Sequence, residues 1–254
     1  MRVFALFLAL VVLVYVGICV ALFVFQRSLI YFPQPSHADS PSTILRLPVS
    51  GAELLVSARP HGGPKALIYF GGNAEDVSLS LLSFSKAFPD YAIYLLHYRG
   101  YGGSSGKPSE EALLSDAQAL FDKVYAEHPS IVVVGRSLGS GVAVHLANQR
   151  PAARLILITP YDSLQELAAR QFSYFPVRWL LRDKFESWRY ASDIRVPTLL
   201  VAAQFDEVIP RFSTDQLYAH FANGVATLKV IPDTGHNTIS ENPLYLEALK
   251  GWLL

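Results

Sequence analysis

The hydrophobic residues of this chain follow two patterns, one confined to the N-terminus and one spread over the remaining sequence. Residues 1–25 contain only two non-hydrophobic residues, Arg2 and Gly17. Residues 3–25 carry no charge and would form a helix about 35 Å long at about 1.5 Å per residue. Because the hydrocarbon core of a bilayer is about 30 Å thick, this run predicts an uncleaved, single-pass membrane anchor.

The alternative for this segment is a cleaved signal peptide. Its apolar run exceeds the usual h-region of about 7–15 residues, and no A-x-A cleavage site follows it. Arg27, Tyr31 and Phe32 come next, which are residue types suited to a membrane interface. We therefore place the anchor at residues 1–27 and one soluble domain at residues 28–254. The N-terminal amine and Arg2 outweigh Arg27 by one charge, which favours a domain on the exported side.

After a connector with Pro and Ser at residues 33–41, short apolar runs alternate with helical patterns. The runs are continuously apolar, as strands buried on both faces are. Residues 110–125 predict an amphipathic helix, with Ser109 as N-cap and Glu110 and Glu111 at the positive end of its dipole. This alternation predicts an α/β fold with a mostly parallel central sheet and helices on both faces. The predicted strands are 66–70, 92–97, 131–134, 155–159, 198–203 and 227–231.

Two stretches depart from the alternation. Residues 61–64 (His-Gly-Gly-Pro) predict a turn, and we expect a hairpin there, before the strand at 66–70. Residues 160–196 are too many for one crossover and too apolar for a solvated loop. They predict a short helical cap over the top of the sheet.

Composition excludes several classes of protein. The chain has 254 residues with 21 Lys+Arg against 21 Asp+Glu and no basic run, so no nucleic-acid partner is expected. The sole cysteine, Cys19, lies in the apolar segment, and neither a disulfide framework nor a metal or cofactor is implied. Without residues 1–25 the hydrophobic share falls from 51% to about 47%, an ordinary value for a globular domain.

The strongest chemical motif is G-x-S-x-G at residues 135–139, with its serine at Ser137. It follows the strand at 131–134 and precedes a helical pattern at 142–148, which is the context of a nucleophile elbow. The glycines permit a sharp turn and close packing of helix on strand. The Ser137 hydroxyl should therefore project above the sheet edge, near N–H groups that favour developing negative charge.

A serine hydroxyl needs a neighbouring base to become nucleophilic. His236 lies in a loop directly after the last predicted strand, at the same sheet edge as Ser137, and is the expected base. His97 also follows a strand, but we expect it to be packed or hydrogen-bonded. Asp206 follows the strand at 198–203 and should orient the base and stabilise its imidazolium. The rivals for that role are Glu207, Asp162 and Asp233.

Acyl transfer also needs donors for the oxyanion of the tetrahedral intermediate. A glycine turn, Gly71-Gly72-Asn73, follows the strand at 66–70 at the same edge. We expect the backbone N–H groups of Asn73 and Leu138 to be these donors.

Together these motifs resemble the α/β-hydrolase superfamily, which has the same chain order of Ser137, Asp206 and His236. More narrowly, the chain is similar to single-pass, membrane-anchored α/β-hydrolase domain-containing serine hydrolases, which include protein depalmitoylases and lysophospholipases. Such relatives usually carry a histidine where this chain has Gly71 and an aspartate where it has His97. The stretches that carry the resemblance are 26–33, 72–74, 98–102, 105–111, 135–139, 205–210 and 235–237.

The resemblance implies that the Tyr-Arg-Gly-Tyr run at 98–101 structures the loop beside the active site, with Arg99 contacting backbone carbonyls rather than substrate. It also implies a serine hydrolase that cleaves an ester or thioester of a small acyl or lipid-like substrate through an acyl-enzyme. Two alternatives stay open, a serine peptidase of the same fold and a non-catalytic, membrane-anchored interaction module. The sequence does not predict the oligomeric state.

Overall fold

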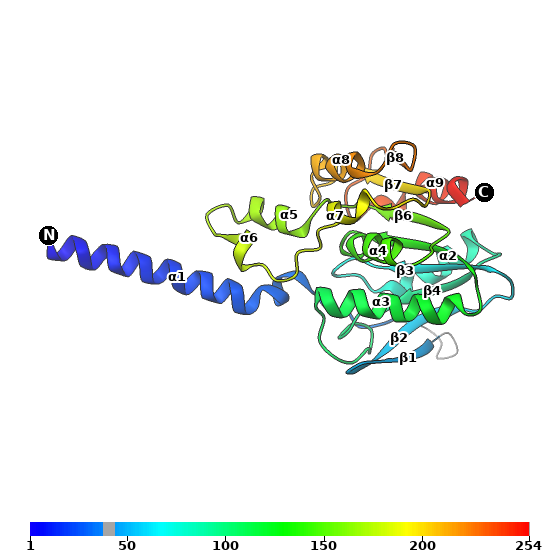
Figure 1. Ribbon diagram of the computed structural model, residues 1–254, viewed down its shortest axis with the longest axis horizontal. Coiled ribbons are helices and arrows are strands. Elements are labelled where there is room, and N and C mark those ends of the chain that lie inside the picture. Colours follow the sequence, from blue (N-terminus) through cyan, green and yellow to red (C-terminus); the bar gives the residue numbers. More distant parts are fainter. Residues whose placement is uncertain (38–43, 254) are drawn as a thin grey trace.

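The fold is an eight-stranded sheet in the order β1-β2-β4-β3-β5-β6-β7-β8, in a computed structural model that describes residues 1–37 and 44–253 (Figure 1). Residues 38–41 of the predicted connector lie outside this range. Strands β1, β2 and β4 pair antiparallel, and all pairs from β4 to β8 are parallel. The strands are β1 (Ile44–Val49), β2 (Ala52–Arg59), β3 (Lys65–Phe70), β4 (Ala92–Leu96), β5 (Ser130–Arg136), β6 (Arg154–Ile158), β7 (Thr198–Ala203) and β8 (Ala226–Ile231).

Helices cover both faces of the sheet, as the alternation predicts. Side chains of α3, α4 and α8 share one hydrophobic core, and those of α2 and α9 share the other. Strand β3 shows why its apolar run is continuous: Ala66, Ile68 and Phe70 face the first core, whereas Leu67 and Tyr69 face the second. The helices are α1 (Arg2–Ile30), α2 (Leu81–Ala87), α3 (Glu110–Tyr125), α4 (Leu138–Gln149), α5 (Leu164–Gln171), α6 (Val177–Leu180), α7 (Trp188–Ala191), α8 (Arg211–His220) and α9 (Pro243–Leu253), with short 3-10 turns η2 (Val77–Ser80) and η3 (Ile239–Glu241).

The predicted elements recur with nearly the same bounds. All six predicted strands form the parallel part of the sheet, and α3 has the predicted range. The Ser109 hydroxyl caps α3 by accepting the N–H of Ala112. Glu110 lies in the first turn of α3 as predicted, and its carboxylate also accepts the N–H groups of Lys184 and Phe185, which ties α3 to the cap.

The hairpin prediction is wrong in its location. The hairpin joins β1 and β2, where Val49 pairs with Ala52 across a turn in which Gly51 has φ +73°. The turn at residues 61–64 connects β2 to β3, but these strands do not pair, because β4 lies between them. The glycines and the proline signalled a reversal of the chain but carried no information on which strands it joins.

Helix α1 projects away from the domain, and α5 and α6 of the cap lie beside its C-terminal half (Figure 1). By length and composition, α1 is a helix that could cross a membrane. It runs without a break to Ile30; its last turns pack on the domain, and Tyr15 in its middle contacts the cap. Gln26 and the following Tyr31 are buried there, whereas most of the preceding side chains are exposed.

Candidate active site

Ser137 occupies a strained turn between β5 and α4. Its φ of 49° and ψ of −117° lie where residues with a β-carbon are rarely found. The turn is held by the Ser137 N–H, which donates to the Ile158 carbonyl at 2.9 Å. No side chain fits at the two flanking glycines. A β-carbon at Gly139 would lie 2.1 Å from the Phe70 carbonyl oxygen, and a β-carbon at Gly135 would lie 2.2 Å from the Gly139 carbonyl oxygen. These contacts confirm the expected close packing of α4 on the sheet.

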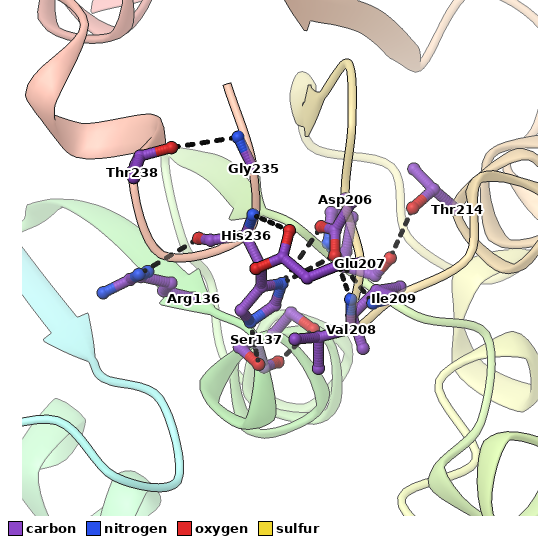
Figure 2. A network of polar contacts seen from close by, with 12 residues as sticks. Arg136, Ser137, Asp206, Glu207, Val208, Ile209, Thr214, Gly235, His236 and Thr238 are labelled. Carbon is purple, nitrogen blue, oxygen red and sulfur yellow. Dashed lines mark hydrogen bonds and ion pairs between the residues drawn. The ribbon is translucent and has the colours of Figure 1, made fainter. Parts of the chain in front are cut away.

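Figure 2 shows Ser137, His236 and Asp206 converging from three loops at the C-terminal ends of the strands. His236 Nε2 lies 3.0 Å from Ser137 Oγ. His236 Nδ1 lies 3.0 Å from both carboxylate oxygens of Asp206. The side chains of His236 and Asp206 are 6% and 7% exposed, so this series of hydrogen bonds is shielded from water. The structure therefore brings together the three side chains that the sequence singled out.

The carboxylate of Asp206 is fixed by its own turn, since its Oδ1 accepts the N–H groups of Val208 and Ile209 at 3.0 and 2.7 Å. Glu207 accepts the backbone N–H of His236 at 3.0 Å and thus holds the histidine loop rather than the imidazole ring (Figure 2). Asp162 accepts the hydroxyl of Ser213 instead. Of the four candidate carboxylates, Asp206 is the one hydrogen-bonded to the ring of His236 among the described residues.

The loop after β3 places Asn73 beside Ser137, and both line the same cavity. The conformation of this loop depends on the Tyr-Arg-Gly-Tyr run, because the Tyr98 and Tyr101 hydroxyls donate to the carbonyls of Gly71 and Asn73 at 2.9 and 2.7 Å. Burial raises the pKa of Tyr98 well above its ordinary value, so this residue remains a hydroxyl donor. Within the part of the chain that the structure describes, neither the Asn73 nor the Leu138 backbone N–H donates to a protein acceptor.

A partly buried ion pair, which the sequence did not single out, joins the loops of the site. Glu75 accepts the N–H of Gly72 at 2.8 Å and the Tyr69 hydroxyl at 2.7 Å, and it lies 3.2 Å from Arg136. Arg136 also donates to the backbone carbonyl of His236 at 3.2 Å. The oxyanion-side loop, the serine turn and the histidine loop are thereby cross-linked. The available signal was the position of Arg136 within the G-x-S-x-G motif.

The cavity over Ser137 measures about 620 Å³ and is mostly apolar. Its roof comes from the cap, including Leu167 and Phe175, and from the end of α1, including Leu22 and Leu29. The participation of α1 was not predicted from the sequence, which assigned that segment to anchoring alone. In the described residues, no group of three or more His, Cys, Asp or Glu side chains is arranged to hold a metal ion.

Two further residues singled out from the sequence act in the scaffold. His97 is buried and its Nε2 lies 2.8 Å from the Ser57 hydroxyl, as expected for a hydrogen-bonded residue. Arg99 pairs mainly with the buried Asp116 of α3, at 2.7 Å, and donates to one backbone carbonyl, that of Ser50. The expected contact with a backbone carbonyl is therefore present, but the principal partner is a carboxylate that α3 presents at that point, which the sequence did not indicate.

Comparison with known proteins agrees with this fold. The sequence model of the Hydrolase_4 family, described as serine aminopeptidase S33, matches residues 87–191. An uncharacterized protein of Mycobacterium tuberculosis is 32% identical over 265 aligned residues, covering 96% of this chain and 93% of its own length. Protein bem46 of Schizosaccharomyces pombe is 26% identical, covering 91% and 87%.

Solved structures share the fold at low identity. The esterase Pf2001 of Pyrococcus furiosus has a TM-score of 0.72 at 18% identity, covering 88% of this chain and 96% of its own. Est1E of Butyrivibrio proteoclasticus, solved with ferulic acid bound, has a TM-score of 0.67 at 17% identity, covering 82% and 97%. With the parallel sheet and the serine turn after β5, these relationships show that the chain belongs to the α/β-hydrolase family, in the group described by Hydrolase_4.

Proposed function

We propose that this protein is a serine hydrolase in which Ser137 is the nucleophile, His236 the general base and Asp206 the carboxylate that orients it. The observation that carries the proposal is the shielded series of hydrogen bonds from Asp206 through His236 to Ser137, which ends at the floor of an apolar cavity. A histidine so placed can take the hydroxyl proton as the oxygen attacks a carbonyl carbon.

The reaction then proceeds in two halves. The first tetrahedral intermediate bears a negative oxygen, which the N–H groups of Asn73 and Leu138 stabilise. The imidazolium of His236 returns its proton to the leaving alcohol or thiol, and the carbonyl-to-leaving-group bond breaks to give acyl-Ser137. Water, deprotonated by His236, attacks this ester, and the carboxylic acid leaves as Ser137 regains its proton.

The lining of the cavity supports an ester or thioester of an acyl or lipid-like chain as the substrate. Leucine and phenylalanine side chains dominate it, and a hydrocarbon chain gains free energy when it is transferred onto such a surface. The description of the matched family favours a second candidate, an aminopeptidase. Such an enzyme must bind an α-ammonium group, and Glu207 is the cavity-lining carboxylate available for this.

Residues 1–27 are proposed to anchor the hydrolase domain, 28–254, as a single-pass membrane protein. The N-terminal charge bias supports a domain on the exported side. A reporter enzyme that is active only in the cytoplasm, fused to the C-terminus, tests the orientation: its activity would contradict the exported arrangement.

Labelling with a fluorophosphonate probe tests the proposed chemistry. We expect the wild-type protein to label and Ser137→Ala to remain unlabelled. Failure of the wild type to label, or equal labelling of the variant, would contradict the proposal and leave the non-catalytic alternative. Comparing hydrolysis of acyl esters, acyl thioesters and short peptides with a free amine then decides between esterase and aminopeptidase.

A further inference from the structure

The cap touches α1 far from the domain, in the middle of the apolar run. The Tyr15 hydroxyl donates to the Tyr174 backbone carbonyl at 3.0 Å, and the Tyr15 ring stacks on Phe175 with centroids 5.7 Å apart. Tyr15 lies about 15 Å before Phe25 along the helix axis, at about 1.5 Å per residue. If residues 3–25 cross a hydrocarbon core about 30 Å thick, this contact lies near its centre.

The part of the cap beside α1 is aromatic and exposed. Trp179 is 88% exposed and Tyr174 87% exposed, and Phe172 is also exposed. They belong to residues 172–181, the loop and short helix α6 that lie beside α1 (Figure 1). Clustered apolar exposure of this kind marks a surface covered by another apolar phase, and tryptophan and tyrosine favour membranes.

From Phe175 onward, most backbone N–H groups of this segment have carbonyl acceptors, which suits a medium without water. The N–H groups of Phe175, Val177 and Trp179 donate to carbonyls within the segment, and Pro176 has no N–H. The Tyr174 carbonyl is satisfied by Tyr15 itself. Non-helical backbone is tolerated at membrane depth only where its polar groups have protein partners.

Polar contacts mark the level at which the cap returns to the domain. Gln26 donates to the Leu180 carbonyl and accepts the N–H of Arg182, at 3.1 and 2.6 Å. One residue further along α1, Arg27 pairs with the buried Asp183 at 3.0 Å. Gln26 and Arg27 thus mark the level at which the apolar run of α1 ends, as at a membrane interface. Within residues 172–181 the charged side chain is that of Arg178, which is paired with Glu166 of α5 at 2.8 Å.

We propose that residues 172–181 lie in the bilayer against α1, so that the cavity over Ser137 opens to the hydrocarbon layer and receives an acyl chain sideways from it. Leu22 and Leu29 of α1 and Phe175 and Leu180 of the cap line the cavity between these two elements. Insertion of residues 172–181 into the bilayer does not depend on the proposed hydrolase activity. Entry of the substrate from the bilayer rests on the proposed function.

Tryptophan fluorescence tests the insertion in the full-length protein, which has three tryptophans, Trp179, Trp188 and Trp252. Trp188→Phe combined with Trp252→Phe leaves Trp179 alone. The matched control, Trp179→Phe with Trp188→Phe, leaves Trp252 of α9, at the other end of the molecule from α1 (Figure 1). Both are reconstituted in phosphatidylcholine vesicles brominated midway along the acyl chains. We expect bromine to quench Trp179 at least about threefold more than Trp252, because only Trp179 lies within the core.

Equal quenching of the two tryptophans would overturn the proposed insertion. If a double variant fails to fold, Cys19→Ser with Tyr174→Cys gives a second test. The new thiol should react with a membrane-impermeant maleimide in detergent but not in intact vesicles. Reaction at the same rate in both would also overturn it.

Tyr15→Phe tests entry from the bilayer, with Tyr125→Phe on α3 as its control. Loss of the Tyr174 contact should lower hydrolysis of a long-chain thioester presented in vesicles by about three- to tenfold, the usual weight of one hydrogen bond. Hydrolysis of a soluble acetyl ester should not change. Equal rates for Tyr15→Phe and wild type on both substrates would contradict entry along α1. Absence of fluorophosphonate labelling in the wild type would instead overturn the proposed chemistry, and the quenching result would still stand.

Discussion

The site is built from two regions of opposite character. Its floor comprises Ser137, Asp206, His236 and the loop 71–75, which are held by hydrogen bonds at the ends of buried strands. Its roof comprises residues 164–181 of the cap and residues 22–30 of α1, which are largely apolar and partly exposed. The side chains of the floor must be placed to within a few tenths of an ångström, and several hydrogen bonds at the strand ends fix them there. A roof that needs only an apolar surface is held by few polar contacts.

This difference predicts that changes in the floor affect all substrates alike, whereas changes in the roof select among them. A nucleophile and its base must meet at hydrogen-bond distance whichever acyl group is transferred. The roof touches only the part of the substrate away from the reacting carbonyl, so its influence should grow with the length of the chain.

The largest expected effect is that of Asp206→Asn. Its amide would favour the wrong tautomer of His236 and should lower kcat by about 10⁴, as the corresponding change does in a serine protease. The neighbouring Glu207→Gln is the matched control, because Glu207 holds only the backbone N–H of His236, and it should cost less than about tenfold. Rates on a short-chain thioester measure both. Equal losses would contradict the assignment of Asp206.

Packing under the nucleophile comes next. Gly139→Ala places a β-carbon 2.1 Å from the Phe70 carbonyl oxygen, so α4 would have to move off the sheet. We expect the free energy of unfolding to fall by at least about 3 kcal/mol. Gly251→Ala in α9 is the control, since its β-carbon meets open space, and it should be neutral or stabilising by up to about 1 kcal/mol. Denaturant titration in detergent compares the two, and similar stabilities would refute the steric requirement.

Leu29→Trp tests the roof. The indole would fill the cavity beside α1 and should lower kcat/KM for a long-chain thioester by about 10- to 100-fold, while the acetyl ester changes by less than about twofold. Leu10→Trp lies on the same helix away from the cavity and should leave both unchanged. A parallel loss on long and short substrates would mean that Leu29 acts through the floor rather than by contact with the chain.

The smallest expected effect is on the pH dependence of stability, through the buried His97. Burial lowers the pKa of His97 from its ordinary value of 6.5, so the unfolded chain binds its proton more readily than the folded one. Stability from the neutral imidazole is therefore complete above pH 6.5 and is lost as pH falls through the lower folded pKa. One proton limits the slope to about 1.4 kcal/mol per pH unit. His97→Gln should make the decline of the unfolding midpoint shallower between pH 7.5 and 5.5; an unchanged slope would contradict this.

The floor was more predictable from the sequence than the roof. Strands buried on both faces must be continuously apolar, and in a parallel sheet the residues that follow them meet at one edge. These two facts, together with the G-x-S-x-G motif and the chain order shared with α/β-hydrolases, selected Ser137, His236 and Asp206. The Glu75–Arg136 pair was missed because nothing in either local sequence indicates a partner 61 residues away.

The contacts of the roof were not predicted because they join α1 to the cap, two segments that lie far apart in the sequence. Gln26 and Arg27 meet residues 180–183 about 150 positions later, and neither stretch specifies the other. Tyr15, a hydroxyl in the middle of an apolar run, was the one local signal, since a polar group at membrane depth needs a partner. The alternation of strands and helices likewise could not reveal which neighbour each early strand pairs with, hence the misplaced hairpin.

The most direct test of the central claim is mass spectrometry of the Ser137 peptide after rapid quenching of the full-length protein mixed with a long-chain acyl thioester. Formation of an acyl-enzyme predicts a peptide heavier by one acyl group less one proton, appearing before the free acid accumulates and absent in Ser137→Ala. Turnover of the thioester without acylated Ser137 would contradict the proposed mechanism.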